Sequence, residues 1–166
     1  MRMIGAVLLQ FLLVPAALGA DLKPYVGKGV QNKVNGRTLF EVANVKKNLT
    51  AAFGATRYEL VAGHEASGSA IAQESDPELG ELVISSQCQP HNCPNASTVI
   101  LTTNAKAIGL CLTDVDETDA EKTVEEWFGS GWTLRKVHDQ LGCRFETPSE
   151  AIDGFKAARR AAGKGG

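Results

Sequence analysis

The chain has 166 residues and a formal net charge of −2; 43% of its residues are hydrophobic and 22% are charged. This length fits one domain, and this composition is ordinary for a soluble globular protein, which argues against a wholly disordered chain, a collagen-like chain or a coiled coil. The chain has no surplus of Lys and Arg to neutralise phosphates, so nucleic-acid binding is not expected.

The first twenty residues have the pattern of an export signal. Arg2 precedes an apolar stretch from Ile4 to Val14, and small residues follow up to Ala20. The apolar stretch is about half of the roughly 20 residues that a membrane span needs, so residues 1–20 are interpreted as a signal peptide that is cleaved after Gly19 or Ala20. Cleavage removes one Arg and no acid, which leaves a mature chain with a net charge of −3 and no membrane anchor.

Export changes the interpretation of the four cysteines, because thiols in an oxidising compartment form disulfides. Four cysteines allow three pairings. Cys88 and Cys93 are separated by only four residues and are predicted to pair, which leaves Cys111 and Cys143 as the second pair.

The chain after the signal begins with residues 21–37, which mix proline, glycine and lysine without a period and are predicted to be a flexible leader. A domain is expected over residues 38–160. Its first helix is predicted to start at the capping-box pattern Thr38-x-x-Glu41 and to end at Gly54, with an apolar stripe between them. The stripe consists of Val42, Val45, Leu49 and Phe53.

The middle of the chain is predicted to form a sheet, because β-branched and apolar residues cluster or alternate there. Strands are expected at residues 57–62, 79–87, 98–103 and 107–113, with a hairpin turn at 104–106. Residues 124–128 fit a strand or a helix, helical spacing predicts helices over 133–141 and 152–162, and residues 161–166 are a predicted flexible tail. This order predicts an α+β fold with a central antiparallel sheet flanked by helices.

The hexapeptide Cys88-Gln89-Pro90-His91-Asn92-Cys93 lies between two predicted strands. A disulfide across so short a loop adds little to global stability, but with Pro90 it makes a rigid protrusion that carries His91 near its tip. Rigidity reduces the entropy lost on binding. On residue chemistry alone, the loop fits a stapled hairpin with a solvated histidine, a metal site with three ligands, or a redox site; its spacing differs from the Cys-x-x-Cys of thioredoxin-like enzymes.

From about Thr38 to Phe155 the sequence resembles the Ivy family, bacterial periplasmic inhibitors of vertebrate lysozyme. That family carries the loop Cys-Lys-Pro-His-Asp-Cys on an α+β domain, and this chain has Cys88, Pro90, His91 and Cys93 in register. The other similar segments are the helix that ends near Phe53, the strand before Cys88, the hairpin 98–113, Asp114-Val115-Asp116-Glu117, and Ile152-Asp153-Gly154-Phe155.

The resemblance implies that the loop enters the active-site cleft of a c-type lysozyme, where His91 hydrogen-bonds the catalytic acids. An imidazole suits this role because it can bridge a carboxylic acid and a carboxylate, the pair that lysozyme uses. Gln89 and Asn92 replace the family's Lys and Asp, so both loop charges are absent. This difference predicts weaker binding to lysozyme or a different target, such as an endogenous lytic transglycosylase.

The sequence therefore predicts a periplasmic binding protein, not an enzyme, with Cys88 to Cys93 as its inhibitory loop and with no cofactor or metal. Homodimers occur in the family, so self-association is a further expectation. The alternative from another class is a metal-binding or thiol-redox protein that uses the Cys/His cluster. His64 and His138 are predicted to be exposed. The predicted core aromatics are Trp127, Phe128 and Trp132, and the acidic residues 114–121 are predicted to be solvated surface.

Overall fold

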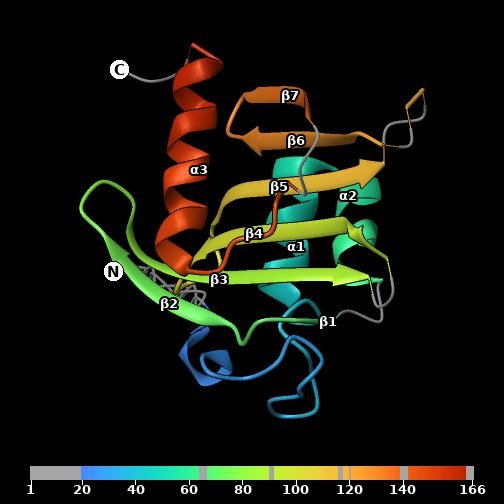
Figure 1. The fold of residues 1–166 in the computed structure, drawn as a ribbon. Coiled ribbons are helices and arrows are strands. Elements are labelled where there is room, and N and C mark those ends of the chain that lie inside the picture. The colour runs from blue at the N-terminus through green and yellow to red at the C-terminus, as the bar shows by residue number, and fades with distance from the viewer. Residues whose placement is uncertain are drawn as a thin grey trace, which may run out of the picture.

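The computed structural model in Figure 1 describes residues 20–63, 67–89, 92–115, 118–119, 121–138 and 142–163. The side chains of Asn92, Cys93 and His138 lie outside the described part of the chain, as do His64 and all of the predicted signal peptide except Ala20. Within the described residues, no helix combines the length and the apolar character needed to cross a membrane.

A seven-stranded antiparallel sheet forms the centre of the molecule. Its strands are β1 (Ser67–Gly68), β2 (Ala72–Asp76), β3 (Gly80–Gln89), β4 (Asn92–Thr102), β5 (Ala107–Val115), β6 (Thr123–Gly129) and β7 (Trp132–His138). From β3 to β7 each strand pairs with the next one in the chain, and the short strands β1 and β2 share the other side of β3. The sheet is therefore a meander whose pairings are local in sequence.

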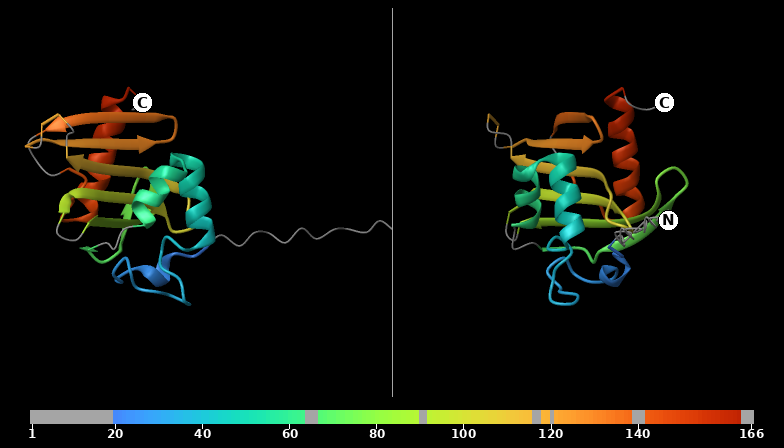
Figure 2. Two further views of the ribbon diagram at one scale, coloured as in Figure 1. Left: turned by 90° about the vertical axis from the view of Figure 1, so that its right-hand side faces the viewer. Right: turned by 180° about the vertical axis from the view of Figure 1, so that it is seen from behind.

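Helices cover both faces of this sheet, as the two views of Figure 2 show. One face, called here the α1–α2 face, packs against α1 (Ala43–Phe53) and α2 (Ala55–Ala62). The other, the α3 face, packs against α3 (Pro148–Ala161). Side chains alternate between the faces along each strand: in β3, Val83 belongs to the α1–α2 core, whereas Leu82 and Ile84 belong to the α3 core.

Aromatic side chains anchor both cores. On the α1–α2 face, the hydroxyl of Tyr58 donates to the carbonyl of Phe40 at 3.0 Å, and burial raises the pKa of this phenol. On the α3 face, the ring of Trp127 lies 5.7 Å from that of Phe145 and 6.2 Å from that of Phe155, between ring centroids. Trp127 and Phe128 are buried on opposite faces of β6, which confirms them as core residues.

The structure confirms the α+β fold and most of the predicted elements. The strands expected at 79–87, 98–103 and 107–113 are β3, β4 and β5, the undecided segment at 124–128 is β6, and the terminal helix is α3. Val45, Leu49 and Phe53 are buried in α1, and Gly54 ends that helix with φ 92°, a conformation that glycine adopts without strain.

The first helix starts five residues later than the capping pattern predicts. The backbone N–H of Thr38 donates to Oε2 of Glu41 at 2.7 Å, so one of the two expected bonds of the box is present. Residues 39–41 nevertheless form a turn, and this turn buries the adjacent side chains of Leu39 and Phe40, which a helix would point in different directions. Burial of two neighbouring apolar groups therefore outweighs the local capping signal.

Two predicted elements are wrong in type. The segment 57–62 was expected to be a strand, but it lies in α2, where Tyr58 and Val61 are buried three residues apart and Leu60 is 47% exposed. The segment 133–141 was expected to be a helix, but residues up to His138 form β7, which pairs with β6 through a turn at Gly131, with φ 74°. In both cases tertiary packing decides between two periods that a short apolar pattern cannot distinguish.

Residues 21–37, predicted to be a flexible leader, are packed against the domain. Leu22 is fully buried, and Tyr25 and Val30 join it in the α1–α2 core. Backbone hydrogen bonds anchor the segment to the sheet edge: the N–H of Leu22 donates to Thr103 at 2.9 Å, and that of Gly27 donates to Ile71 at 2.8 Å. The packed part of the chain thus begins near Leu22 and not at residue 38.

Candidate binding surface at the end of the β3–β4 hairpin

The predicted inhibitory loop lies at the end of the β3–β4 hairpin. The two strands pair from Leu82 and Thr102 up to Cys88 and Ala96, and Gln89 then pairs with Asn92. The chain passes from β3 to β4 through Pro90 and His91, which lie outside the described residues. The register places the hexapeptide at the turn of the hairpin, where sequence analysis expected it.

A bulge in β4 supports the base of this hairpin. Residues 93–95 have no partner in β3, because the register moves from Cys88–Ala96 directly to Gln89–Asn92. The side chain of Asn95 turns back and donates from Nδ2 to Oε1 of Gln89 at 3.2 Å. A pair of neutral amides therefore joins the two strands beside the turn.

The cysteines divide between the hairpin and the core. Cys111 and Cys143 form a disulfide, as predicted, with their Cα atoms 5.4 Å apart. Cys88 is also disulfide-bonded; the side chain of its predicted partner, Cys93, lies outside the described residues. Because Cys143 is bonded to Cys111, a cross-link from Cys88 to Cys143, which would remove the rigid-loop argument, is excluded.

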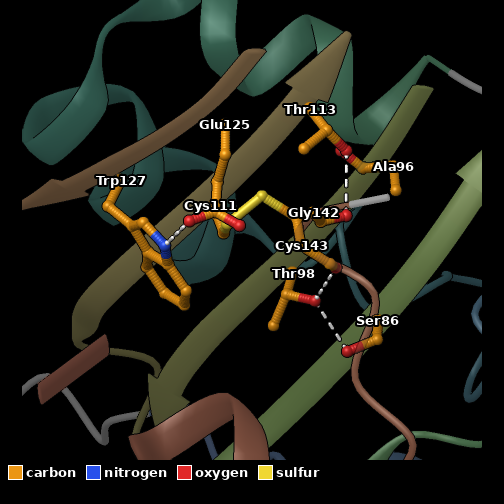
Figure 3. Close-up of a disulfide and its surroundings, with 9 residues drawn as sticks. All are labelled: Ser86, Ala96, Thr98, Cys111, Thr113, Glu125, Trp127, Gly142 and Cys143. Carbon is orange, nitrogen blue, oxygen red and sulfur yellow. Dashed lines mark hydrogen bonds between the residues drawn. A yellow bond between two sulfur atoms is a disulfide. The ribbon is translucent and has the colours of Figure 1, made fainter. Parts of the chain in front are cut away.

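The Cys111–Cys143 bond fastens the segment before α3 across the α3 face of the sheet, as Figure 3 shows. Gly142 allows this close approach: a Cβ there would lie 2.5 Å from Oε2 of Glu125 and 2.6 Å from Cγ2 of Thr113. Cys143 itself has φ 52°, in the left-handed region. The disulfide thus holds a strained, closely packed crossing in place.

This crossing supplies hydrogen-bond partners to polar side chains of the sheet (Figure 3). The hydroxyl of Thr98 donates to the carbonyl of Cys143 at 2.7 Å, and the hydroxyl of Thr113 donates to that of Gly142 at 3.1 Å. Since Thr98 has one hydroxyl proton, the 2.7 Å contact between Ser86 and Thr98 has Ser86 as its donor. The polar groups of Ser86, Thr98 and Thr113 are therefore satisfied beneath the crossing segment.

Cys111, Cys143 and Glu125 also form the one group of possible metal ligands found among the described residues, with ligand atoms within 4.8 Å of one another. Both sulfurs are in the disulfide, and metal binding to cysteine needs thiolates. The carboxylate of Glu125 instead accepts a hydrogen bond from the indole of Trp127 at 2.8 Å. In its oxidised form this cluster is a structural bond with a neighbouring acid.

The other residues considered from sequence lie away from the hairpin or outside the described part. Trp132 is half-buried and its ring lies 5.4 Å from that of Phe155, so it belongs to the core. In the acidic segment, Asp114 is exposed and Asp119 forms an exposed ion pair with Lys122 at 3.3 Å, while residues 116, 117 and 120 are outside the described chain.

Sequence reasoning did not identify two concave surfaces beside the hairpin. A groove of about 770 Å³ runs along β1 and the segment from Arg144 to Glu146, on the side of the crossing. A smaller pocket of about 190 Å³ lies on the α1–α2 face and is lined in part by Cys88 and Asn95. Their polar lining residues sit at ordinary strand positions, and only the pairing of the strands brings them together.

These features define the class of the protein as an α+β fold with an antiparallel meander, covered on both faces and with a cysteine-bearing hairpin at one end. In comparisons with known proteins, no family model, no curated protein and no solved structure matches the chain.

Proposed function

We propose that this chain is a protein inhibitor of c-type lysozyme or a related muramidase, and that it acts by inserting the hairpin end with His91 into the acidic cleft of that enzyme. The observation that carries the proposal is the pairing of Gln89 with Asn92, which makes the hexapeptide the end of a two-stranded hairpin with a disulfide-bonded cysteine at its base. A hairpin end of this kind is narrow enough to enter a cleft and loses little entropy on docking.

The chemistry of the loop matches that of the proposed target. Lysozyme-type enzymes place two carboxyl groups about the scissile bond, one of them held protonated. The two ring nitrogens of His91 can donate to the carboxylate and accept from the carboxylic acid. A net charge of −3 after removal of residues 1–20 also favours encounter with a basic enzyme.

Gln89 and Asn92 adapt the loop to a different balance of charge. The resemblance described above has Lys and Asp at these positions, whereas here Gln89 accepts a hydrogen bond from Asn95 and carries no charge. A charge-assisted hydrogen bond is about twice as strong as a neutral one, so this loop binds a c-type lysozyme less tightly than a charged loop would. A lytic transglycosylase, whose cleft has a catalytic acid, is the second target that the proposal includes.

The deciding experiment titrates the activity of a c-type lysozyme and of a lytic transglycosylase with the oxidised mature protein. Beside it stand His91→Ala and a matched control, His138→Ala, which changes the same residue type in β7. We expect the parent and the control to inhibit at least one enzyme, and His91→Ala to weaken inhibition about tenfold or more, which is about 1.4 kcal/mol. Equal inhibition by parent and His91→Ala, or no inhibition of either enzyme by the parent, overturns the proposal.

A second variant tests the role of the missing loop charge. Asn92→Asp restores the acid, and we expect it to tighten inhibition of c-type lysozyme by several-fold because a charged acceptor replaces a neutral one. An unchanged inhibition constant contradicts this account of Asn92.

A further inference from the structure

The pocket of about 190 Å³ on the α1–α2 face lies beside the base of the hairpin. One row of paired residues crosses its floor: Gln87 of β3 pairs with Ser97 of β4, Ser97 with Leu112 of β5, and Leu112 with Glu126 of β6. Its other lining residues include Leu60 of α2, Asp114 of β5 and Val124 of β6. The pocket therefore joins the end of α2 to four adjacent strands.

Two buried acceptors on this floor have no hydrogen-bond partner. Gln87 is 5% exposed and Ser97 is 4% exposed, yet Oε1 of Gln87 and Oγ of Ser97 are unpaired. The amide of Gln87 is fixed in orientation, because its Nε2 donates to the carbonyl of Val61 at 2.7 Å in the last turn of α2. Its free Oε1 is therefore held as an acceptor in the pocket.

Unpaired buried polar atoms are costly to a fold, and native structures retain few of them without a reason. One bridging water does not fill this space, since its volume is roughly six times the 30 Å³ that a water molecule occupies in the liquid. The pocket is thus suited to an occupant that is larger than one water and brings hydrogen-bond donors.

The lining specifies the chemistry of that occupant. Asp114 and Glu126 add carboxylate oxygens, which only accept hydrogen bonds when ionised, to the acceptor of Gln87. Leu60, Leu112 and Val124 supply apolar walls. An aliphatic chain that ends in a cationic donor group satisfies both parts, and this is the construction of a lysine or arginine side chain. The exposed Arg135 pairs with Glu126 in the β6–β7 ladder but does not line the pocket.

We propose that this pocket receives a lysine or arginine side chain of the protein that the β3–β4 hairpin binds. Cys88 and Asn95 belong both to the base of the hairpin and to the pocket wall, so a partner that covers the hairpin also covers the pocket mouth. The inference rests on the proposed function for the identity of the partner, and it adds a second contact that selects a basic enzyme. The pocket supplies the negative charge that Asn92 no longer gives to the loop.

The first test examines the pocket without any partner. The ¹⁵N-labelled protein is titrated with n-butylammonium and n-butylguanidinium chlorides, and with n-butanol as the neutral control of the same chain length. We expect saturable shifts of the Gln87 side-chain amide and the Ser97 backbone amide with the cations and much smaller ones with butanol. Glu126→Gln should weaken cation binding about fivefold, whereas Glu74→Gln, which removes the same charge from β2, should not.

Equal shifts with butanol and the cations, or no saturable shift at these two residues, overturn the inference. The second test uses the complex with whichever target enzyme the parent inhibits. Glu126→Gln should weaken inhibition about fivefold, and Ser97→Ala should weaken it as well, while Glu74→Gln retains the parent value. If His91→Ala abolishes inhibition but Glu126→Gln and Ser97→Ala do not change it, the proposed function stands and this inference fails. If the cations bind the pocket but neither enzyme is inhibited, the pocket chemistry stands and the proposed partner is wrong.

Discussion

The two faces of the sheet differ sharply at the hairpin end, although the same strands form both. On the α3 face, the row of Ser86, Thr98 and Cys111 lies beneath a crossing segment that accepts its hydrogen bonds and is fastened by a disulfide. On the α1–α2 face, the adjacent row of Gln87 and Ser97 is equally buried but retains unpaired acceptors above a pocket. One face is completed by the chain itself, and the other is left to be completed by a partner.

This difference explains why polar residues occur in the middle of β3 and β4 at all. A buried hydroxyl stabilises a fold only where its partner is present, and otherwise it costs free energy. The α3 face meets this condition within the chain, so its polar groups add to stability. The α1–α2 face does not, so its polar groups are better understood as parts of a binding surface.

The largest expected effect comes from removing the fastening on the α3 face. Replacing both cysteines in Cys111→Ala/Cys143→Ala should lower the free energy of unfolding by about 3–4 kcal/mol, because a cross-link over a separation of 32 residues restricts the unfolded chain. Urea unfolding of parent and variant, followed by tryptophan fluorescence, measures the difference. A loss below about 1 kcal/mol would show that the crossing segment is held mainly by its hydrogen bonds.

A pair of neighbouring substitutions compares the two faces directly. Thr98→Val keeps the shape of the side chain but leaves the carbonyl of Cys143 and the hydroxyl of Ser86 without their partner, so it should cost about 1–3 kcal/mol. Ser97→Ala, one residue earlier, removes a hydroxyl that has no partner and should change stability by less than about 0.5 kcal/mol. Equal losses for the two variants in urea unfolding would contradict the contrast between the faces.

The smallest expected effect concerns the contact between the cover of the α3 face and the sheet edge. The ammonium of Lys156 in α3 hydrogen-bonds Asp76 of β2 and, with the backbone N–H groups of Leu79 and Glu78, holds the pKa of this carboxyl below its usual range. Asp76→Asn should therefore cost about 1 kcal/mol near neutral pH.

The pH dependence of this effect follows from the direction of the shift. A carboxyl whose pKa is lower in the folded state stabilises the fold above its unfolded pKa of about 3.9, and this contribution disappears as the pH falls through the folded value. The stability difference between parent and Asp76→Asn should thus be full at neutral pH and vanish in acid. Asp153→Asn, an exposed acid on the same helix α3, serves as the charge control. A difference that is independent of pH would rule out the charged contact as its cause.

Sequence alone was sufficient for the parts of this molecule in which local and tertiary signals agree. The β-branched residues 98–103, the apolar spacing of α1 and the remaining cysteine pair all led to structures that the fold confirms. It was insufficient where a short apolar pattern fits two periods. Tyr58, Leu60 and Ala62 alternate like a strand, but Tyr58 and Val61 bury one side of a helix.

The two concave surfaces could not be predicted from sequence for a different reason. Gln87 and Ser97 have the spacing of outward polar residues in a half-solvated strand, and nothing in their neighbours in sequence distinguishes a buried acceptor from a solvated one. Their burial depends on α2 lying across the strand ends and on Val61 fixing the amide of Gln87. The end of the hairpin, in contrast, was predictable because its turn residues and cysteines are adjacent in the chain.

The meander also imposes an order on assembly. Every pairing from β3 to β7 joins neighbours in the chain, so the sheet can grow hairpin by hairpin, whereas the crossing segment is contributed only by residues after β7. Cys143 meets Cys111 in its native position only on a sheet that is already built. A chain that stops short of residue 143 retains all the strands but carries Cys111 as an unmatched thiol, so the oxidation state of that one sulfur reports whether the molecule has been finished.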